Sequence, residues 1–123
     1  ADELPQYVRV AYTVTEQVHS TRRDVLERLL RAYSRGVRHA LENKADAVEL
    51  GVRLLAQPAE QIAQAFDLFT ERKWINPTGI VQRSSLEWMQ DLNLKLKLQD
   101  SRVNLDELTD FSIAEKVAKE LGA

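Results

Sequence analysis

Two histidines are the side chains best suited to bind a metal or transfer a proton near neutral pH. Neither His19 nor His39 belongs to an H-x-x-x-H or H-E-x-x-H arrangement, which aims two ligating groups at one metal ion. The chain has no cysteine, so thiolate zinc sites, disulfides and cysteine nucleophiles are excluded. His19 follows Glu16 by three residues, and a structural hydrogen bond or plain exposure is the simpler expectation for it. We therefore predict no metal site and no cofactor.

Three carboxylates, Asp106, Glu107 and Asp110, lie close together near the end of the chain. General acid–base catalysis needs carboxylates in a desolvated cleft with separated pKa values, and nothing in this polar connector indicates burial. Capping of the final predicted helix by Thr109, Asp110 or Ser112 explains these residues better. There is no G-x-S-x-G motif, and the four glycines are scattered. The sequence predicts no catalytic residue, and we expect that the protein is not an enzyme.

Four arginines share one side of a long predicted helix: Arg28, Arg31, Arg35 and Arg38. This arginine stripe could be a docking surface for a membrane permease, an acidic partner or phosphates. The simpler alternative is a solvated face with pairs at i, i+4 spacing. Those pairs would be Asp24 with Arg28, Glu27 with Arg31 and Arg38 with Glu42.

Residues 7–15, YVRVAYTVT, are β-branched or aromatic almost throughout and alternate between two faces, so we predict a β-strand. A strand must pair its backbone groups, and the only other extended candidate is the short alternating segment 94–98. Either the two segments pair with each other, or the pairing partners lie in a missing region or in another chain.

Apolar residues at spacings of three and four predict that the rest of the chain is helical. Ser20 or Thr21 can cap the first helix, and Pro58 suits the first turn of the third. Asn76-Pro77-Thr78-Gly79 has the composition of a turn. The predicted helices cover about 21–42, 45–56, 58–72, 78–92 and 111–121.

The composition is that of one soluble globular segment, with 44% hydrophobic and 29% charged residues in 123. A formal net charge of −2 gives no electrostatic reason to expect nucleic acid as a partner. No apolar run is long enough to cross a bilayer.

Several short motifs follow one another in the second half of the chain. They are Trp88 in an amphipathic helix, a connector with Lys95 and Lys97, the acidic step at 106–108, and Asp110 with the segment 112–116. Together with a strand and a long helix at the front, this order resembles the C-terminal part of periplasmic solute-binding proteins of ABC importers, of the sulfonate, nitrate and thiamine-precursor type. The resemblance extends over nearly all 123 residues.

The resemblance implies a mainly α segment with one N-terminal strand, forming the C-terminal part of a two-lobed α/β fold of the type II class. It implies capture of a small organic or oxyanion-type solute by lobe closure. It further implies an ABC permease as partner, a periplasmic or extracytoplasmic location, and a leader on the full-length precursor.

In the resembled family the leading strand passes close to the cleft, which makes Tyr12 and Thr13 the candidate ligand-binding residues. Packing of Tyr12 as an ordinary strand residue is the alternative. The chain departs from the family where Asn93 replaces a frequent glycine and Ile113 replaces a usual phenylalanine. Related pyrimidine synthases use iron and a cysteine-rich motif, which this chain lacks. A free-standing helical interaction module that docks through the arginine stripe is the second interpretation.

Overall fold

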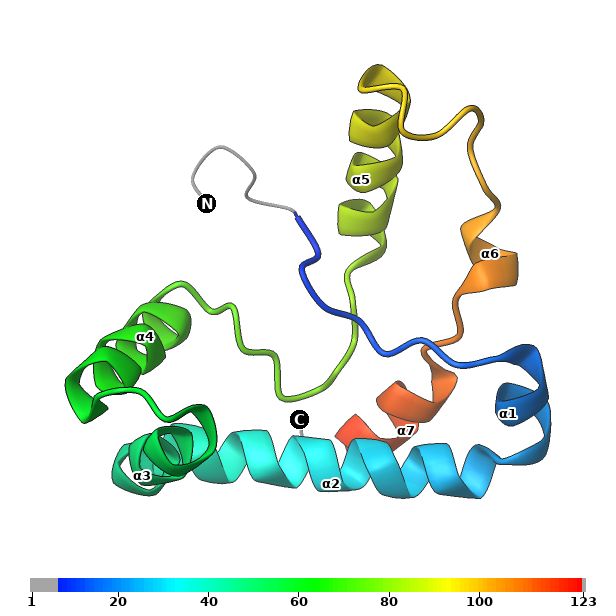
Figure 1. Ribbon diagram of the computed structural model, residues 1–123. Helices are drawn as coiled ribbons and strands as arrows, with labels where there is room; N and C mark the ends of the chain where they lie inside the picture. Colours follow the sequence, from blue (N-terminus) through cyan, green and yellow to red (C-terminus); the bar gives the residue numbers. More distant parts are fainter. Residues whose placement is uncertain (1–6, 123) are drawn as a thin grey trace.

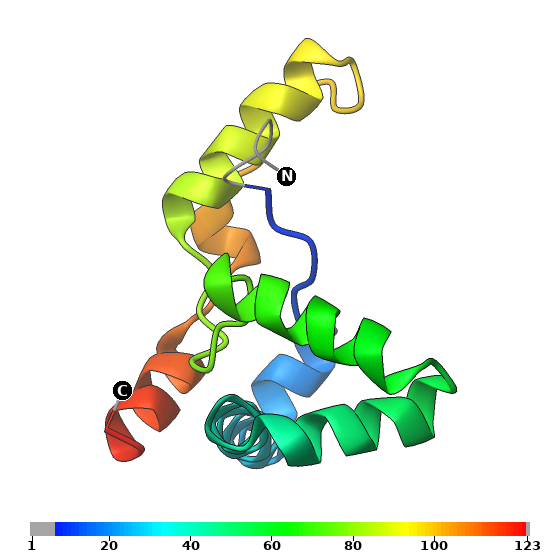
Figure 2. The ribbon, with the colours of Figure 1, turned by 90° about the vertical axis from the view of Figure 1, so that its left-hand side faces the viewer.

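The computed structural model describes residues 7–122, and this part of the chain is mainly helical, as predicted. The helices are α1 (Glu16–Thr21), α2 (Arg23–Glu42), α3 (Lys44–Leu55), α4 (Ala59–Glu71), α5 (Arg83–Lys95), α6 (Leu105–Leu108) and α7 (Ser112–Glu120). The long helix α2 forms the base of the molecule, and α7 lies against it (Figure 1). The α3–α4 pair and α5 project from this base at different places (Figure 2), which leaves the molecule open.

The predicted strand at 7–15 is wrong, because the structure has no strand within residues 7–122. Residues 7–15 instead form an extended, irregular segment that we call the N-terminal ribbon. Its proposed pairing partner, the segment 94–98, is the end of α5 followed by a turn, with Lys97 at a φ of 58°. The backbone groups of 94–98 are therefore used in local hydrogen bonds, and the ribbon has no strand to pair with.

Some helix ends differ from the predicted ones, because local side-chain hydrogen bonds compete with the backbone hydrogen bonds of a helix. The helix expected at 21–42 corresponds to α2 (Arg23–Glu42), and a short helix that was not predicted, α1, precedes it. Thr15 caps α1 by accepting a hydrogen bond from the Val18 N–H at 3.3 Å, whereas the predicted caps Ser20 and Thr21 lie within α1 and donate to the Gln17 carbonyl. The helix expected at 78–92 begins only at Arg83. The Asn76 side chain accepts hydrogen bonds from Thr78, and Gly79 has a φ of 70°, so the predicted turn extends further than expected.

The core lies between α2, α6 and α7. Its buried apolar residues are Leu26, Leu105, Ile113, Ala114, Val117 and Ala118. The four from α7 recur at spacings of three and four and so form one face of that helix, as the sequence predicted. This face packs on α2 and fixes the position of the chain's last helix.

The α3–α4 pair contains no buried residue between Lys44 and Glu71. The two helices approach closely where Gly51 faces Ile62, since a Cβ on Gly51 would lie 2.7 Å from Ile62 Cγ2. Several large apolar side chains remain exposed on their outer surfaces, and Leu54 is 70% exposed. The chain exposes 9263 Å² in total, whereas a compact monomer of its mass exposes about 6,700 Å².

Candidate functional site

The two predicted ligand-binding residues, Tyr12 and Thr13, lie on the N-terminal ribbon, and both are exposed. The ring of Tyr12 meets the ring of Tyr33 edge to face, with centroids 5.4 Å apart and planes at 83°. Tyr33, on α2, donates a hydrogen bond of 2.8 Å to the Asn76 carbonyl. Burial raises the pKa of Tyr33, and the neighbouring Tyr12 adds to the rise. Tyr12 is thus part of an aromatic contact, whereas the Thr13 side chain has no hydrogen-bond partner among the described residues.

Two further side-chain contacts attach the ribbon to the rest of the molecule. The guanidinium of Arg9 lies 4.5 Å from the ring centroid of Trp74, a cation–π contact. The Val8 N–H points to Met89 Sδ at 3.4 Å, which is a weak acceptor. These contacts could not be predicted from the sequence, because the residues they join are far apart in the chain and share no pattern.

His19 and Asp110, which the sequence left unconnected, meet between α1 and the start of α7. His19 Nε2 lies 2.7 Å from Asp110 Oδ2, and Arg23 reaches both Asp110 and Ser112. The Ser112 N–H donates a 2.8 Å hydrogen bond to Asp110 Oδ1, so Asp110 accepts hydrogen bonds at the first turn of α7, in agreement with its predicted capping role. These hydrogen bonds, above all those from Ser112, hold the pKa of Asp110 well below its usual range. The cluster therefore joins helices and keeps its carboxylate ionised.

The other carboxylates of this connector are engaged at the surface. Asp106 forms an ion pair with Arg83, and Glu107 accepts a hydrogen bond from the Asn104 side chain at 2.9 Å. Arg83 also pairs with Glu87. A small polar pocket of about 280 Å³ lies beside them and is lined by both charge signs. Because these charges neutralise one another, the pocket has no free group that would fix an ionic ligand.

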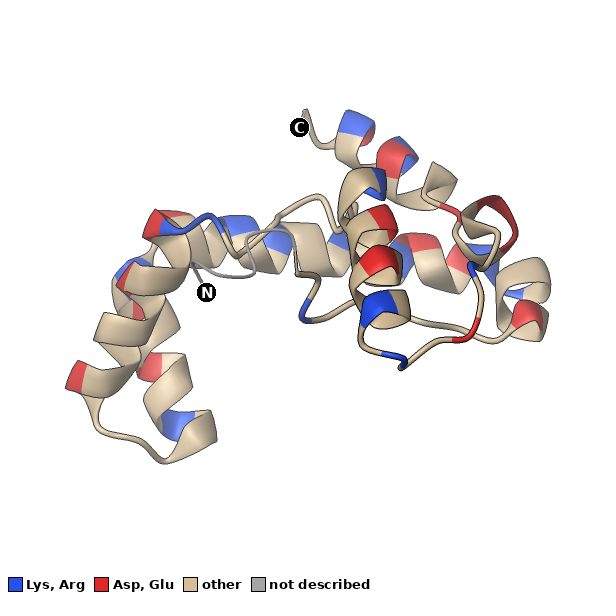
Figure 3. Cartoon of the chain, turned by 90° about the horizontal axis from the view of Figure 1, so that it is seen from above, with Lys and Arg blue, Asp and Glu red and all other residues tan. Residues whose placement is uncertain are grey.

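Most of the arginine stripe is used inside the chain. Arg31 forms a 2.7 Å ion pair with Glu120 and lies 4.0 Å from Glu27, and Arg38 donates to the Leu121 carbonyl. Arg28 pairs with Asp24 at 3.0 Å, as the i, i+4 spacing predicted. Arg35 is exposed. Both charge signs occur along α2, α5 and α7 (Figure 3), and the acidic residues of α2 lie near its two ends.

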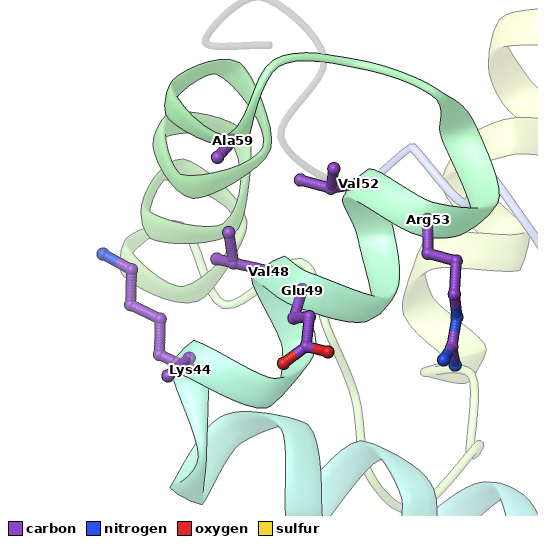
Figure 4. Close-up of a pocket in the computed structure, with 7 residues that line it drawn as sticks. Lys44, Val48, Glu49, Val52, Arg53 and Ala59 are labelled. Atoms are coloured by element: carbon purple, nitrogen blue, oxygen red, sulfur yellow. The ribbon is translucent and has the colours of Figure 1, made fainter.

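A larger cavity is an open apolar groove between α3 and the start of α4, of about 880 Å³. Its lining residues are Lys44, Ala45, Val48, Glu49, Val52, Arg53 and Ala59. Figure 4 shows that the charged end of Lys44 extends away from the charged ends of Glu49 and Arg53. Small-molecule sites have polar groups that converge on the ligand, so this groove has the character of a packing surface. Tyr12 and Thr13 do not line it.

Within residues 7–122, no three His, Cys, Asp or Glu side chains gather in a way that could hold a metal ion. None of the helices in that range is both long and apolar enough to cross a bilayer. No protein-family profile matches the chain, and comparisons with curated proteins and with solved structures find no match.

Proposed function

We propose that this chain is the C-terminal part of an extracytoplasmic solute-binding protein of an ABC importer. In this proposal an α/β lobe covers the exposed apolar surfaces of α3 and α4 and pairs with the N-terminal ribbon. A small organic or oxyanion-type solute binds between the lobes, and an ABC permease receives it. The protein has no catalytic role.

One observation carries the proposal: a segment with the alternation of a strand lies extended and unpaired on a chain that exposes about 2,500 Å² more than a compact monomer of its mass. The exposed surface includes large apolar side chains of α3 and α4, and exposed apolar patches are typical of regions that another body covers. The order of motifs from Trp88 to Lys116 supports the α/β lobe of a solute-binding protein as the part that covers this surface.

The arginine-stripe alternative has less support. Arg28, Arg31 and Arg38 each have a partner within the chain, and docking through them would require those contacts to break. Of the four arginines, only Arg35 has no hydrogen-bond or ion-pair partner among the described residues, and it is exposed.

The test uses the full open reading frame that contains this segment, expressed without its leader. Thermal unfolding is followed with sulfonates, nitrate and thiamine precursors, and we expect one class to raise Tm by mass action. Tyr12→Ala should weaken the binding of that ligand about tenfold, because it removes an aromatic contact. Tyr7→Ala is the matched control, since Tyr7 is an exposed tyrosine on the opposite face of the same ribbon. A start codon directly before Ala1, or no Tm rise with any of these solutes, would contradict the proposal.

A further inference from the structure

The N-terminal ribbon has the properties of an unpaired sheet edge. The Val8 N–H is the only backbone N–H of residues 7–14 that has a hydrogen-bond partner within the described part of the chain, and that partner is a sulfur atom. The side chains of Val10 and Tyr12 are exposed, at 84% and 58%, and Val8 is half-buried. A segment of high β propensity with one charge, no proline and no glycine pairs readily with another strand.

We propose that in the isolated chain a second copy occupies this edge, so that two N-terminal ribbons pair antiparallel about a two-fold axis at Ala11. This inference does not depend on the proposed function. It assigns the ribbon an activity as a strand-pairing interface of the 123-residue chain itself.

The sequence of the ribbon is self-complementary in this register. A two-fold axis perpendicular to the plane of the two strands must pass between the two copies of one residue. The reason is that directly opposite side chains in an antiparallel pair point to the same face. With the axis at Ala11, all of residues 7–15 are paired. Val10 then lies opposite Tyr12 of the other copy, an aromatic and β-branched pair that stabilises sheets.

Charge favours the same register. Arg9 lies opposite Thr13 of the other copy, so the two guanidinium groups stay apart, whereas an axis at Arg9 would place them face to face. The small side chain of Ala11 sits at the axis, where two side chains approach closely. Val8, Val10, Tyr12 and Val14 of both copies form one apolar face.

The exposed area is large enough for such an interface. A standard interface buries about 800 Å² on each partner, and the chain exposes about 2,500 Å² beyond that of a compact monomer of its mass. Pairing also satisfies backbone N–H and C=O groups that have no protein partner in the single chain. The groove on α3 is a second exposed apolar surface, but its residues show no comparable self-complementarity.

The test uses the absence of cysteine from the chain. In the proposed pair the two Ala11 residues form a non-hydrogen-bonded pair with Cα atoms about 4.5 Å apart, which is within disulfide range. The Val10 N–H then donates to the Tyr12 carbonyl of the other copy. Ala11→Cys should therefore form a covalent dimer under mild oxidation about a hundredfold faster than Leu54→Cys, which places an exposed thiol on α3. Mixed Val10→Cys and Tyr12→Cys chains should cross-link to each other faster than Val10→Cys alone.

Light scattering of the unmodified chain should give the mass of a dimer. Val10→Pro should give a monomer with unchanged helical circular dichroism, because proline removes a backbone donor and Val10 contacts little of its own chain. Val10→Thr, the control, should remain dimeric. A monomer at every concentration overturns the proposal. A dimer that survives Val10→Pro, or cross-links fastest through Leu54→Cys, also overturns it and assigns the contact to α3.

Discussion

The two ends of helix α2 carry partners of very different character. At one end α7 buries four apolar residues on α2 and is held by the ion pairs Arg31–Glu120 and Lys116–Glu27. At the other end, α3 and α4 each have an apolar face, yet they bury no residue between Lys44 and Glu71. An amphipathic helix normally turns its apolar face toward a core. The α2–α7 half therefore has a core of its own, whereas the α3–α4 half leaves large apolar side chains such as Leu54 exposed.

The largest effect on stability is expected when a carboxylate is introduced into each half. Val117→Asp should lower the free energy of unfolding by about 3 kcal/mol or more, because Val117 is fully buried and the charge would have no partner. Leu54→Asp, on the exposed surface of α3, should change it by about 0.5 kcal/mol or less. Urea unfolding followed by circular dichroism measures both. Equal effects would mean that the two halves do not differ as described.

The pH dependence of stability tests the cluster at the start of α7. The folded-state pKa of Asp110 is depressed, so its contribution is complete above its unfolded pKa, near 4, and is lost as the pH falls further. A third of this side chain is exposed, which limits the contribution to about 1 kcal/mol. Asp110→Asn should remove this part of the acid dependence in unfolding curves measured between neutral and acidic pH.

Asp46→Asn is the matched control for that experiment. Asp46 also lies near a histidine, at 3.3 Å from His39, but it belongs to the exposed α3 and its side chain is 66% exposed. Its substitution should change the unfolding curves less than Asp110→Asn does, because an ion pair between largely exposed groups contributes little. An equal loss in both variants would contradict the role of Asp110.

The ion pairs between α2 and α7 should contribute less and depend on salt. Glu120→Gln removes the partner of Arg31 and should lower the free energy of unfolding slightly at low ionic strength. At high salt the difference should shrink, since exposed charges are screened. Asp67→Asn, which removes the partner of Lys44 in the α3–α4 half, is the comparison. A cost for Glu120→Gln that did not change with salt would point to packing instead of charge.

The smallest expected effect concerns Ser34, whose hydroxyl is buried in α2 without a hydrogen-bond partner among the described residues. Ser34→Ala should leave stability unchanged or raise it by up to about 1 kcal/mol, because an unsatisfied buried hydroxyl is unfavourable. Ser84→Ala, at an exposed position of α5, should change it by only a few tenths of a kcal/mol. A clear loss of stability in Ser34→Ala would show that the hydroxyl has a partner, such as a bound water.

The periodicity of apolar residues was sufficient to find the five longer helices and the buried face of α7. The capping role of Asp110 also followed from its place before a helical stripe. Short elements were missed: α1 and α6 are too brief for a periodic signal, and their ends depend on the side chains of Thr15 and Asn104. Nothing in the sequence indicated that Tyr12 would lie on Tyr33 or that Arg9 would lie over Trp74.

What the sequence alone determined is local: which segments are helical, which face of each is apolar, and where turns interrupt them. These properties depend on neighbours within a few residues. The tertiary structure decided which of those faces found a partner. Residues 7–15 have the pattern of a strand and α3 has an apolar face, but strands and buried helices exist only where long-range contacts satisfy them. Within residues 7–122 the apolar face of α7 is buried on α2, whereas the ribbon and α3 make partial contacts and have no buried residue.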